Sequence, residues 1–214
     1  MVSKKNQKRD TETILQVVII GALLLFVSFN VGKISMSSSS SMMPLVSAPE
    51  IIPSGVPEIY GATMSVSYND VSPSNPRLAD ATISKLSQYE DMELNAEQLE
   101  RYTIVAGSIS CEYCCGADSI IFANGERACG CAHSYAMRGL AKYLITEHSE
   151  ISDEEVLSEL GKWKVLFFPD IHEQKAAVLE ANGIDSTNYI NLASNLYRGI
   201  EQGQSTGGSM VGGC

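Results

Sequence analysis

Five of the six cysteines of the chain lie within one short segment, CEYCCGADSIIFANGERACGCAH, which spans residues 111–133. This density of soft ligands constrains the fold more than any other feature of the sequence. Such cysteines bind a metal ion, join in disulfides or remain as reactive thiols, and the first two outcomes tie the segment into a compact loop. The spacing of the ligands is therefore the first guide to fold and function.

The segment contains two groups of ligands separated by a predicted hairpin. The first group is Cys111, Cys114 and Cys115, and the second is Cys129, Cys131 and His133. Between them, residues 120–122 favour a strand, and Asn124 followed by Gly125 is typical of a type I′ turn. Apolar residues recur at helical spacing after the second group, so Cys131 and His133 are expected at the first turn of a helix. The N-terminus of a helix stabilises a thiolate, which favours metal binding there.

A cysteine knuckle, a hairpin and ligands from a helix N-terminus follow one another in an order that resembles a treble-clef zinc finger, over residues 111–148. Two features depart from that pattern, because Cys115 extends the knuckle and the second pair is Cys-x-Cys. The stretch CGCAHSYAMRGL is also similar to part of the uncharacterised exported proteins named for a Cys-Tyr-Cys-Gly-Cys motif. That resemblance implies metal handling by Cys129, Cys131 and His133.

We predict a metal site that draws on six candidate ligands: Cys111, Cys114, Cys115, Cys129, Cys131 and His133. Tetrahedral zinc takes about four ligands, so two are spare or the site holds two ions or a cluster. Zn(II) is the expected ion, and Cu(I) is the alternative because sulfur is in excess. Structural disulfides and a dithiol redox centre at Cys111-x-x-Cys114 stay open as other interpretations. His148 and His172 are expected on helix surfaces, away from the site.

An uncharged apolar stretch near the N-terminus predicts a membrane anchor. Residues 13–32 carry no charge, and at about 1.5 Å per residue they reach about 30 Å, the thickness of the hydrocarbon core. We therefore predict a cytoplasmic basic N-terminus over residues 1–12 and a transmembrane signal anchor over residues 13–34. The basic residues before the anchor place the rest of this single-pass membrane protein outside the cytoplasm. A cleaved signal peptide and a pilin-like N-terminus are the alternatives.

The remainder of the chain is predicted to be a tether, one helical domain and a tail. Residues 35–75 are rich in Ser and Pro and are expected to be a linker, and residues 204–214 are expected to be a flexible Gly-rich tail that ends in Cys214. Residues 76–203 are expected to form the Cys-rich metal-binding domain, with residues 111–148 as its treble-clef-like core. The predicted fold class is mainly α with a small β-hairpin.

Hydrophobic periodicity and capping signals locate the helices of that domain. The expected helices are 77–92, 96–110, 153–168, 171–181 and 186–202. Asn95 with Gln98 and Ser152 with Glu155 have the spacing of capping boxes. In the second helix, Leu99, Tyr102 and Val105 are expected to face inward. In the helix 153–168, the expected apolar stripe is Val156, Leu160, Trp163 and Phe167, and in the last helix it is Tyr189, Ala193, Leu196, Tyr197 and Ile200.

The charge of the chain and the absence of catalytic motifs narrow the range of function classes. The chain has a formal net charge of −10, and its first 33 residues are basic, so the exported part is strongly acidic. Such a surface disfavours nucleic acid, and the expected partners are the membrane, a metal ion and a protein of the cell envelope. No Gly-x-Ser-x-Gly elbow, His-Glu-x-x-His motif or phosphate-binding glycine loop is found. We therefore expect a metal carrier, sensor or scavenger rather than an enzyme, with a structural or interaction domain and a thiol–disulfide oxidoreductase as alternatives.

Overall fold

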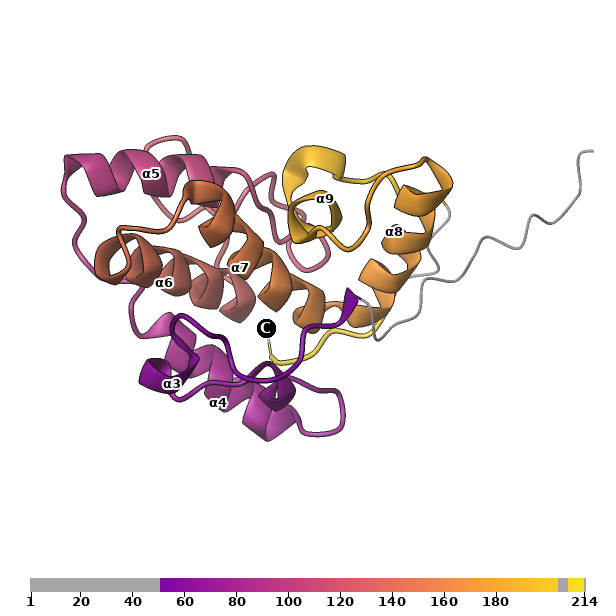
Figure 1. The fold of residues 1–214 in the computed structure, drawn as a ribbon, viewed down its shortest axis with the longest axis horizontal. Helices are drawn as coiled ribbons and strands as arrows, with labels where there is room; N and C mark the ends of the chain where they lie inside the picture. The colour runs from indigo at the N-terminus through magenta and orange to yellow at the C-terminus, as the bar shows by residue number, and fades with distance from the viewer. Residues whose placement is uncertain (1–50, 204–207, 214) are drawn as a thin grey trace, which may run out of the picture. The chain divides into compact units, whose positions relative to one another are not determined.

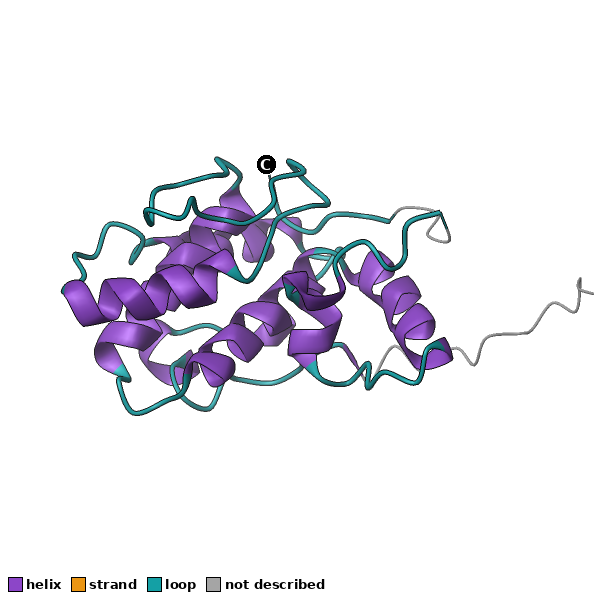
Figure 2. Cartoon of the chain, turned by 90° about the horizontal axis from the view of Figure 1, so that it is seen from above, coloured by secondary structure: helices purple, strands orange, loops and turns teal. Residues whose placement is uncertain are grey.

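The computed structural model describes residues 51–203 and 208–213, all of which belong to a compact unit that begins at Met43. The α-helices are α3 (Gly61–Met64), α4 (Pro76–Ser87), α5 (Ala96–Gly107), α6 (Ala132–Glu147), α7 (Asp153–Phe167), α8 (Pro169–Ala181) and α9 (Tyr189–Ala193). Two 3₁₀ turns, η1 (Tyr68–Asp70) and η2 (Asn195–Tyr197), accompany them. Figure 2 shows helices and loops, with no strand in the described part of the chain. The prediction of a mainly α fold is confirmed.

The predicted membrane anchor, residues 13–34, lies outside the described residues, together with the basic N-terminus and residues 35–50 of the predicted linker. Cys214 and residues 204–207 of the predicted tail also lie outside them. Within the ranges 51–203 and 208–213, no helix combines the length and the hydropathy needed to cross a bilayer.

Helices α6 and α7 form the centre of the fold. Figure 1 shows them beside each other, with α5 on one side and α4 on the other, and α6 packs against α4, α5 and α7. The predicted α7 stripe is completely buried, since Val156, Leu160, Trp163 and Phe167 expose none of their surface. Close approach is needed at Gly139 of α6, where a Cβ atom would lie 2.2 Å from the Leu86 carbonyl oxygen of α4. The core therefore depends on α4 and α6 meeting backbone to backbone.

Local capping signals correctly located the starts of α5 and α7, whereas the helix predicted at 171–181 begins at Pro169 and the one predicted at 186–202 begins at Tyr189. Both predicted capping boxes are present: Asn95 with Gln98 opens α5, and Ser152 with Glu155 opens α7. Tyr102 and Val105 of α5 are buried as expected, but Leu99 is 42% exposed, so its inward placement was wrong. The predicted helix 186–202 is broken into α9 and η2 because Ser194 ends α9 in an extended conformation and then caps η2.

Leu196 in η2 is 62% exposed as a result, so it does not belong to the predicted apolar stripe. Ala193 of that stripe is fully buried, because it lies in α9 before the break. The interruption of the helix therefore divides the stripe between buried and exposed positions.

Residues 51–75 of the predicted linker pack into the core of this unit. The Tyr60 and Tyr68 hydroxyls both donate to Oε2 of Glu159 in α7, at 2.9 and 2.5 Å. The Trp163 indole N–H donates to the Tyr60 hydroxyl at 2.6 Å. These bonds attach the first described segment to the central helix α7.

The predicted β-hairpin is wrong, because the described loop between α5 and α6 contains one isolated bridge, Ile121 to Arg127, and no strand. The turn also differs from type I′, which needs positive φ at both central residues. Only Gly125 has it, at +84°, whereas Asn124 does not. The Phe122 N–H donates to the Glu126 carbonyl at 2.8 Å, which closes a three-residue loop with glycine at its left-handed position.

Candidate metal centre

The first ligand group lies in a tight turn directly after α5. The backbone N–H groups of Cys114 and Cys115 both donate to the Cys111 carbonyl oxygen, at 3.2 Å each. This turn folds the chain back on itself, which places the Cys111 sulfur close to the ligand groups of both Cys114 and Cys115. Cys111 is completely buried, Cys114 is partly buried and Cys115 is exposed.

The second ligand group begins α6, as the sequence predicts. Cys131 is the N-cap of α6, and its sulfur accepts the backbone N–H of Ser134 at 3.4 Å. His133 lies in the first turn and is completely buried, with its ring 4.5 Å from the Phe167 ring and 5.1 Å from the Phe168 ring. The helix N-terminus thus presents one sulfur and one imidazole to the knuckle.

Four of the six predicted ligands come together at this point. One ligand atom from each of Cys111, Cys114, Cys131 and His133 lies within 4.8 Å of all the others. Ligand atoms on one tetrahedral zinc ion lie about 3.5 to 3.8 Å apart, given a Zn–S bond of about 2.3 Å. The four side chains can therefore hold a metal ion after small adjustments of their rotamers.

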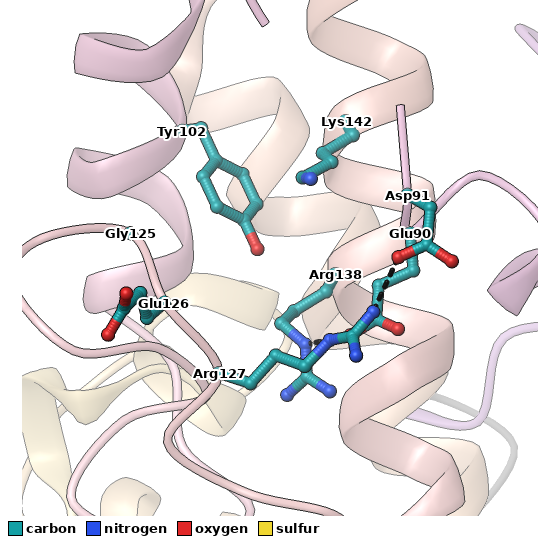
Figure 3. Close-up of a pocket in the computed structure, with 8 residues that line it drawn as sticks. All are labelled: Glu90, Asp91, Tyr102, Gly125, Glu126, Arg127, Arg138 and Lys142. Carbon is teal, nitrogen blue, oxygen red and sulfur yellow. Dashed lines mark hydrogen bonds and ion pairs between the residues drawn. The ribbon is translucent and has the colours of Figure 1, made fainter. Parts of the chain in front are cut away.

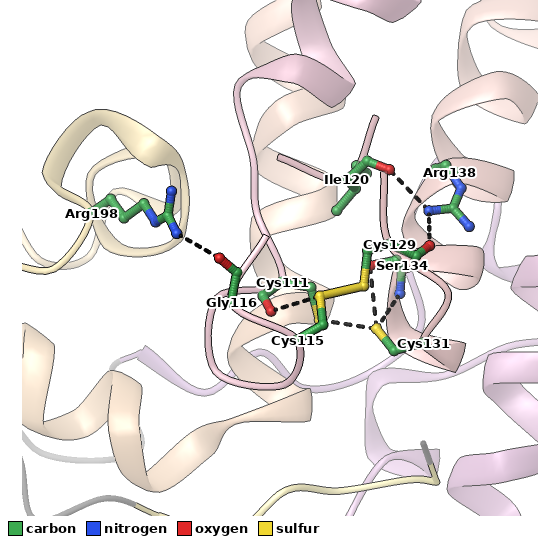
Figure 4. Close-up of a disulfide and its surroundings, with 9 residues drawn as sticks. All are labelled: Cys111, Cys115, Gly116, Ile120, Cys129, Cys131, Ser134, Arg138 and Arg198. Carbon is green, nitrogen blue, oxygen red and sulfur yellow. Dashed lines mark hydrogen bonds between the residues drawn. A yellow bond between two sulfur atoms is a disulfide. The ribbon is translucent and has the colours of Figure 1, made fainter. Parts of the chain in front are cut away.

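The other two predicted ligands are joined to each other. Cys115 and Cys129 form a disulfide whose Cα atoms are 6.8 Å apart, and it links the knuckle to the segment before α6 (Figure 4). The metal-site and disulfide interpretations of the sequence thus apply to different cysteines of one cluster. The two sets remain close, because the sulfurs of Cys111, Cys115 and Cys129 also lie within 4.8 Å of one another.

The sulfurs of Cys111 and Cys131 are 3.1 Å apart and hydrogen-bonded, and their pKa values are shifted in opposite directions. The pKa of Cys131 falls well below its usual value, chiefly because its sulfur accepts a hydrogen bond from Cys111 and also because it is hydrogen-bonded to Ser134. The pKa of Cys111 is raised because its thiol donates to Cys131 and because it is buried. Cys131 is accordingly the thiolate of the pair, the form that binds a metal ion.

A backbone carbonyl orients the imidazole. Nε2 of His133 lies 2.9 Å from the carbonyl oxygen of Val211, which is itself buried near the C-terminus. In the tautomer that donates Nε2–H to this oxygen, Nδ1 keeps the lone pair that a metal requires. The described part of the predicted tail, residues 208–213, therefore contacts the candidate site.

No protein-family model matches the chain, and no curated protein or solved structure is significantly similar to it.

Arg138, which the sequence did not single out, fixes the backbone of the second ligand group. Its Nη1 donates to the carbonyl oxygens of Ile120 and Cys129, at 3.0 and 2.8 Å, and its Nε donates to Glu90 at 2.5 Å. The side chain is 1% exposed. Only its position seven residues after Cys131, about two helical turns along α6, could have suggested a role in the site.

Arg138 also borders a cavity of about 440 Å³ that Tyr102, Arg127 and Lys142 line with it (Figure 3). Arg127 and Arg138 both contact Oε1 of Glu90 there. The ion pair with Glu90 therefore holds Arg138 in place, and through it the carbonyl of Cys129.

Glu112 fixes the knuckle, although its role was also not predicted. Its carboxylate contacts Lys164 of α7 at 3.0 Å and Arg198 at 2.8 Å, and it accepts the Ser110 hydroxyl at 3.1 Å. Burial raises the pKa of Glu112, but the neighbouring lysines and this hydroxyl outweigh burial and lower it overall.

Neither of the other two histidines joins the cluster. His148 is partly exposed and lies beside Glu150, in keeping with a surface position. His172 is completely buried in α8, where its Nδ1 contacts the Phe168 carbonyl at 2.8 Å, so its predicted surface position was wrong. Burial lowers its pKa far below the usual value, which keeps the ring neutral.

Proposed function

We propose that the chain is a metal-binding protein of the cell membrane, with its helical domain outside the cytoplasm and Zn(II) held by Cys111, Cys114, Cys131 and His133. The observation that carries the proposal is the convergence of these four ligands within 4.8 Å. Three sulfurs and one imidazole form a common ligand set for tetrahedral zinc. Cu(I) is the alternative ion, since it also favours sulfur and imidazole ligands.

The exposure of the ligands favours a carrier, sensor or scavenger. Structural zinc sites are closed on all sides, whereas Cys114 is partly exposed at the edge of this cluster. An incoming ligand from a partner or a small chelator can therefore reach the ion through this sulfur. The resemblance to a treble-clef finger remains part of the proposal, because the ligands come from a knuckle and a helix N-terminus.

A structural role is the second candidate, and one observation favours it. Cys111 and His133 are completely buried, and the site joins the knuckle, the start of α6 and the segment around Val211. A metal ion bound there would stabilise the fold whether or not it is exchanged. In that case chelation unfolds the domain, whereas a carrier loses its ion and remains folded.

The extracytoplasmic location is proposed from two supporting features. The first is the uncharged stretch of residues 13–32 with basic residues before it. The second is the Cys115–Cys129 disulfide, since disulfides persist mainly in oxidising compartments. A protein partner in the envelope is proposed to exchange the metal at the Cys114 edge.

Elemental analysis of the full chain, purified anaerobically, tests the metal-binding function. We expect about one zinc or copper ion per chain in the wild type, and less than about a tenth of that in Cys131→Ser. The matched control is the double variant Cys115→Ser/Cys129→Ser, which also loses sulfur but should keep its metal. A metal-free wild type would refute the function, and metal loss in the control would refute the assignment of ligands.

A further inference from the structure

The sulfurs of Cys115, Cys129, Cys111 and Cys131 lie close to one another, from the exposed Cys115 to Cys131 at the N-terminus of α6. Cys115 is the exposed member and is bonded to Cys129. Cys111 lies within 4.8 Å of both of these sulfurs and 3.1 Å from Cys131. A buried thiol therefore stands between a disulfide on one side and a second thiol on the other.

This arrangement has the components of thiol–disulfide exchange. The reaction needs a sulfur nucleophile close to a disulfide and a leaving sulfur that tolerates negative charge. Cys111 is the nearby sulfur, which becomes a nucleophile when the Cys131 thiolate takes its proton, and Cys115 is the sulfur that water can solvate after it leaves. The Cys131 sulfur accepts the backbone N–H of Ser134 at 3.4 Å, which stabilises the thiolate that makes the second attack.

We infer that the cluster undergoes an internal disulfide exchange, in which a Cys111–Cys131 bond replaces the Cys115–Cys129 bond. Cys111 is the central sulfur, because it takes part in both steps. The inference rests on the proposed function only for its consequence, the release of the metal. The exchange itself requires no metal.

The exchange proceeds in two balanced steps. First, Cys111 passes its proton to the Cys131 thiolate across their 3.1 Å contact, and the Cys111 sulfur attacks the sulfur of Cys129, so that a Cys111–Cys129 bond forms and Cys115 leaves as a thiolate. Second, the proton of Cys131 passes through solvent to Cys115, and Cys131 attacks the sulfur of Cys111, so that a Cys111–Cys131 bond forms and Cys129 leaves as a thiolate. One thiol and one thiolate are present before and after. One disulfide exists before and after, so no external oxidant or reductant is needed.

The product cannot hold the metal in the same way. A Cys111–Cys131 disulfide removes two of the four proposed ligands and releases Cys115 as an exposed thiol. Metal binding and the exchanged disulfide therefore exclude each other, and a bound ion favours the Cys115–Cys129 pairing by mass action. Release of the ion is thus coupled to the appearance of a reactive sulfur at the surface.

Disulfide mapping of the full chain tests this inference. Metal-loaded protein and protein treated with a chelator are alkylated, reduced, alkylated with an isotopic label and digested by trypsin and a Glu-specific protease. Cleavage after Glu112 separates Cys111 from the peptide that contains Cys114 and Cys115. Before reduction, that peptide gains one alkyl group in the original pairing and two after exchange.

We expect two alkyl groups on this peptide after chelation, with an unchanged total of free thiols, and one in the metal-loaded protein. Cys111→Ser should keep a single alkyl group after chelation because it lacks the central sulfur, whereas Cys214→Ser should behave as the wild type. If Cys111→Ser does not fold, the comparison of the wild type with and without chelator still tests the exchange. A single alkyl group in both states would overturn the exchange, even where metal is bound and released. Two alkyl groups in a wild type that never binds metal would instead support the exchange and refute the proposed function.

Discussion

Glu112 and Lys164 form an ion pair of 3.0 Å in which the lysine exposes none of its surface. The pair joins the residue after Cys111 to the last turn of α7, so the position of the knuckle depends on a buried charge. The ammonium group of Lys164 also donates to the Ala193 carbonyl oxygen at 2.8 Å, which extends the link to α9. Buried pairs of this kind cost much when one partner is removed, because the other charge stays buried.

Lys164→Met is therefore expected to destabilise the domain by about 3 kcal/mol, since Glu112 loses its buried partner. Urea unfolding, followed by the fluorescence of Trp163, the single tryptophan of the chain, measures the change. Lys162→Met is the matched control on the same helix. Lys162 is partly exposed in its pair with Glu159, so its loss should cost less than about 1 kcal/mol. Equal losses in both variants would contradict the role of Lys164.

The lowered pKa of Lys175 should make the free energy of unfolding depend on pH. This lysine is completely buried in α8, its Nζ makes no hydrogen bond within the described part of the chain, and burial with the charge of Lys164 lowers its pKa to about 8. Between about pH 8 and the ordinary lysine pKa of about 10.4, the unfolded chain binds more protons at this residue than the folded one. The Lys175 contribution to the free energy of unfolding therefore rises with pH across this window.

Lys175→Met should remove that contribution. We expect the difference in unfolding free energy between wild type and variant to change by about 1.5 kcal/mol from pH 8 to pH 9.5, in favour of the wild type as pH rises. Urea titrations at several pH values give the difference, and other titrating groups cancel because both proteins carry them. A constant difference across the window would show that Lys175 keeps its proton in the folded state.

Gly139→Ala tests the close contact between α4 and α6. A methyl group there would meet the Leu86 carbonyl at 2.2 Å, so the helices must separate, and we expect a loss of about 1 to 3 kcal/mol. Gly107→Ala is the control, because no atom lies within 4 Å of the place that its Cβ would take, and alanine favours the helix. Thermal unfolding should therefore shift down for the first variant and change little or rise for the second.

Sequence reasoning succeeded where the signal is local. The capping boxes at Asn95 and Ser152 and the buried stripe of α7 depend on residues within a few positions of each other, so spacing alone predicts them. The break after α9 was missed because Ser194 competes for the backbone with its own hydroxyl, a choice that periodicity does not detect.

The division of the six ligands could not be predicted in the same way. Cys114 and Cys115 are adjacent, and only the turn around the Cys111 carbonyl decides which of them faces His133 and which faces Cys129. The partners that hold the site come from distant segments, as Lys164, Arg198 and Val211 show. No spacing rule connects these residues to the cysteines, because the tertiary fold brings them together.

The contact between His133 and Val211 leads to a prediction about the affinity of the metal site. Carbonyl groups that accept the second N–H of a ligating histidine fix its tautomer, and their loss typically weakens metal binding by about 10- to 100-fold. A chain that ends after Gln202 lacks Val211 and should bind zinc more weakly by that factor, as measured by competition with a chromophoric chelator. Cys214→Ser in the full-length chain is the control for the thiol that the truncation also removes. If the truncated chain kept the affinity of the wild type, the Val211 carbonyl would not orient the imidazole, and if Cys214→Ser reproduced the loss, the thiol rather than the carbonyl would be responsible.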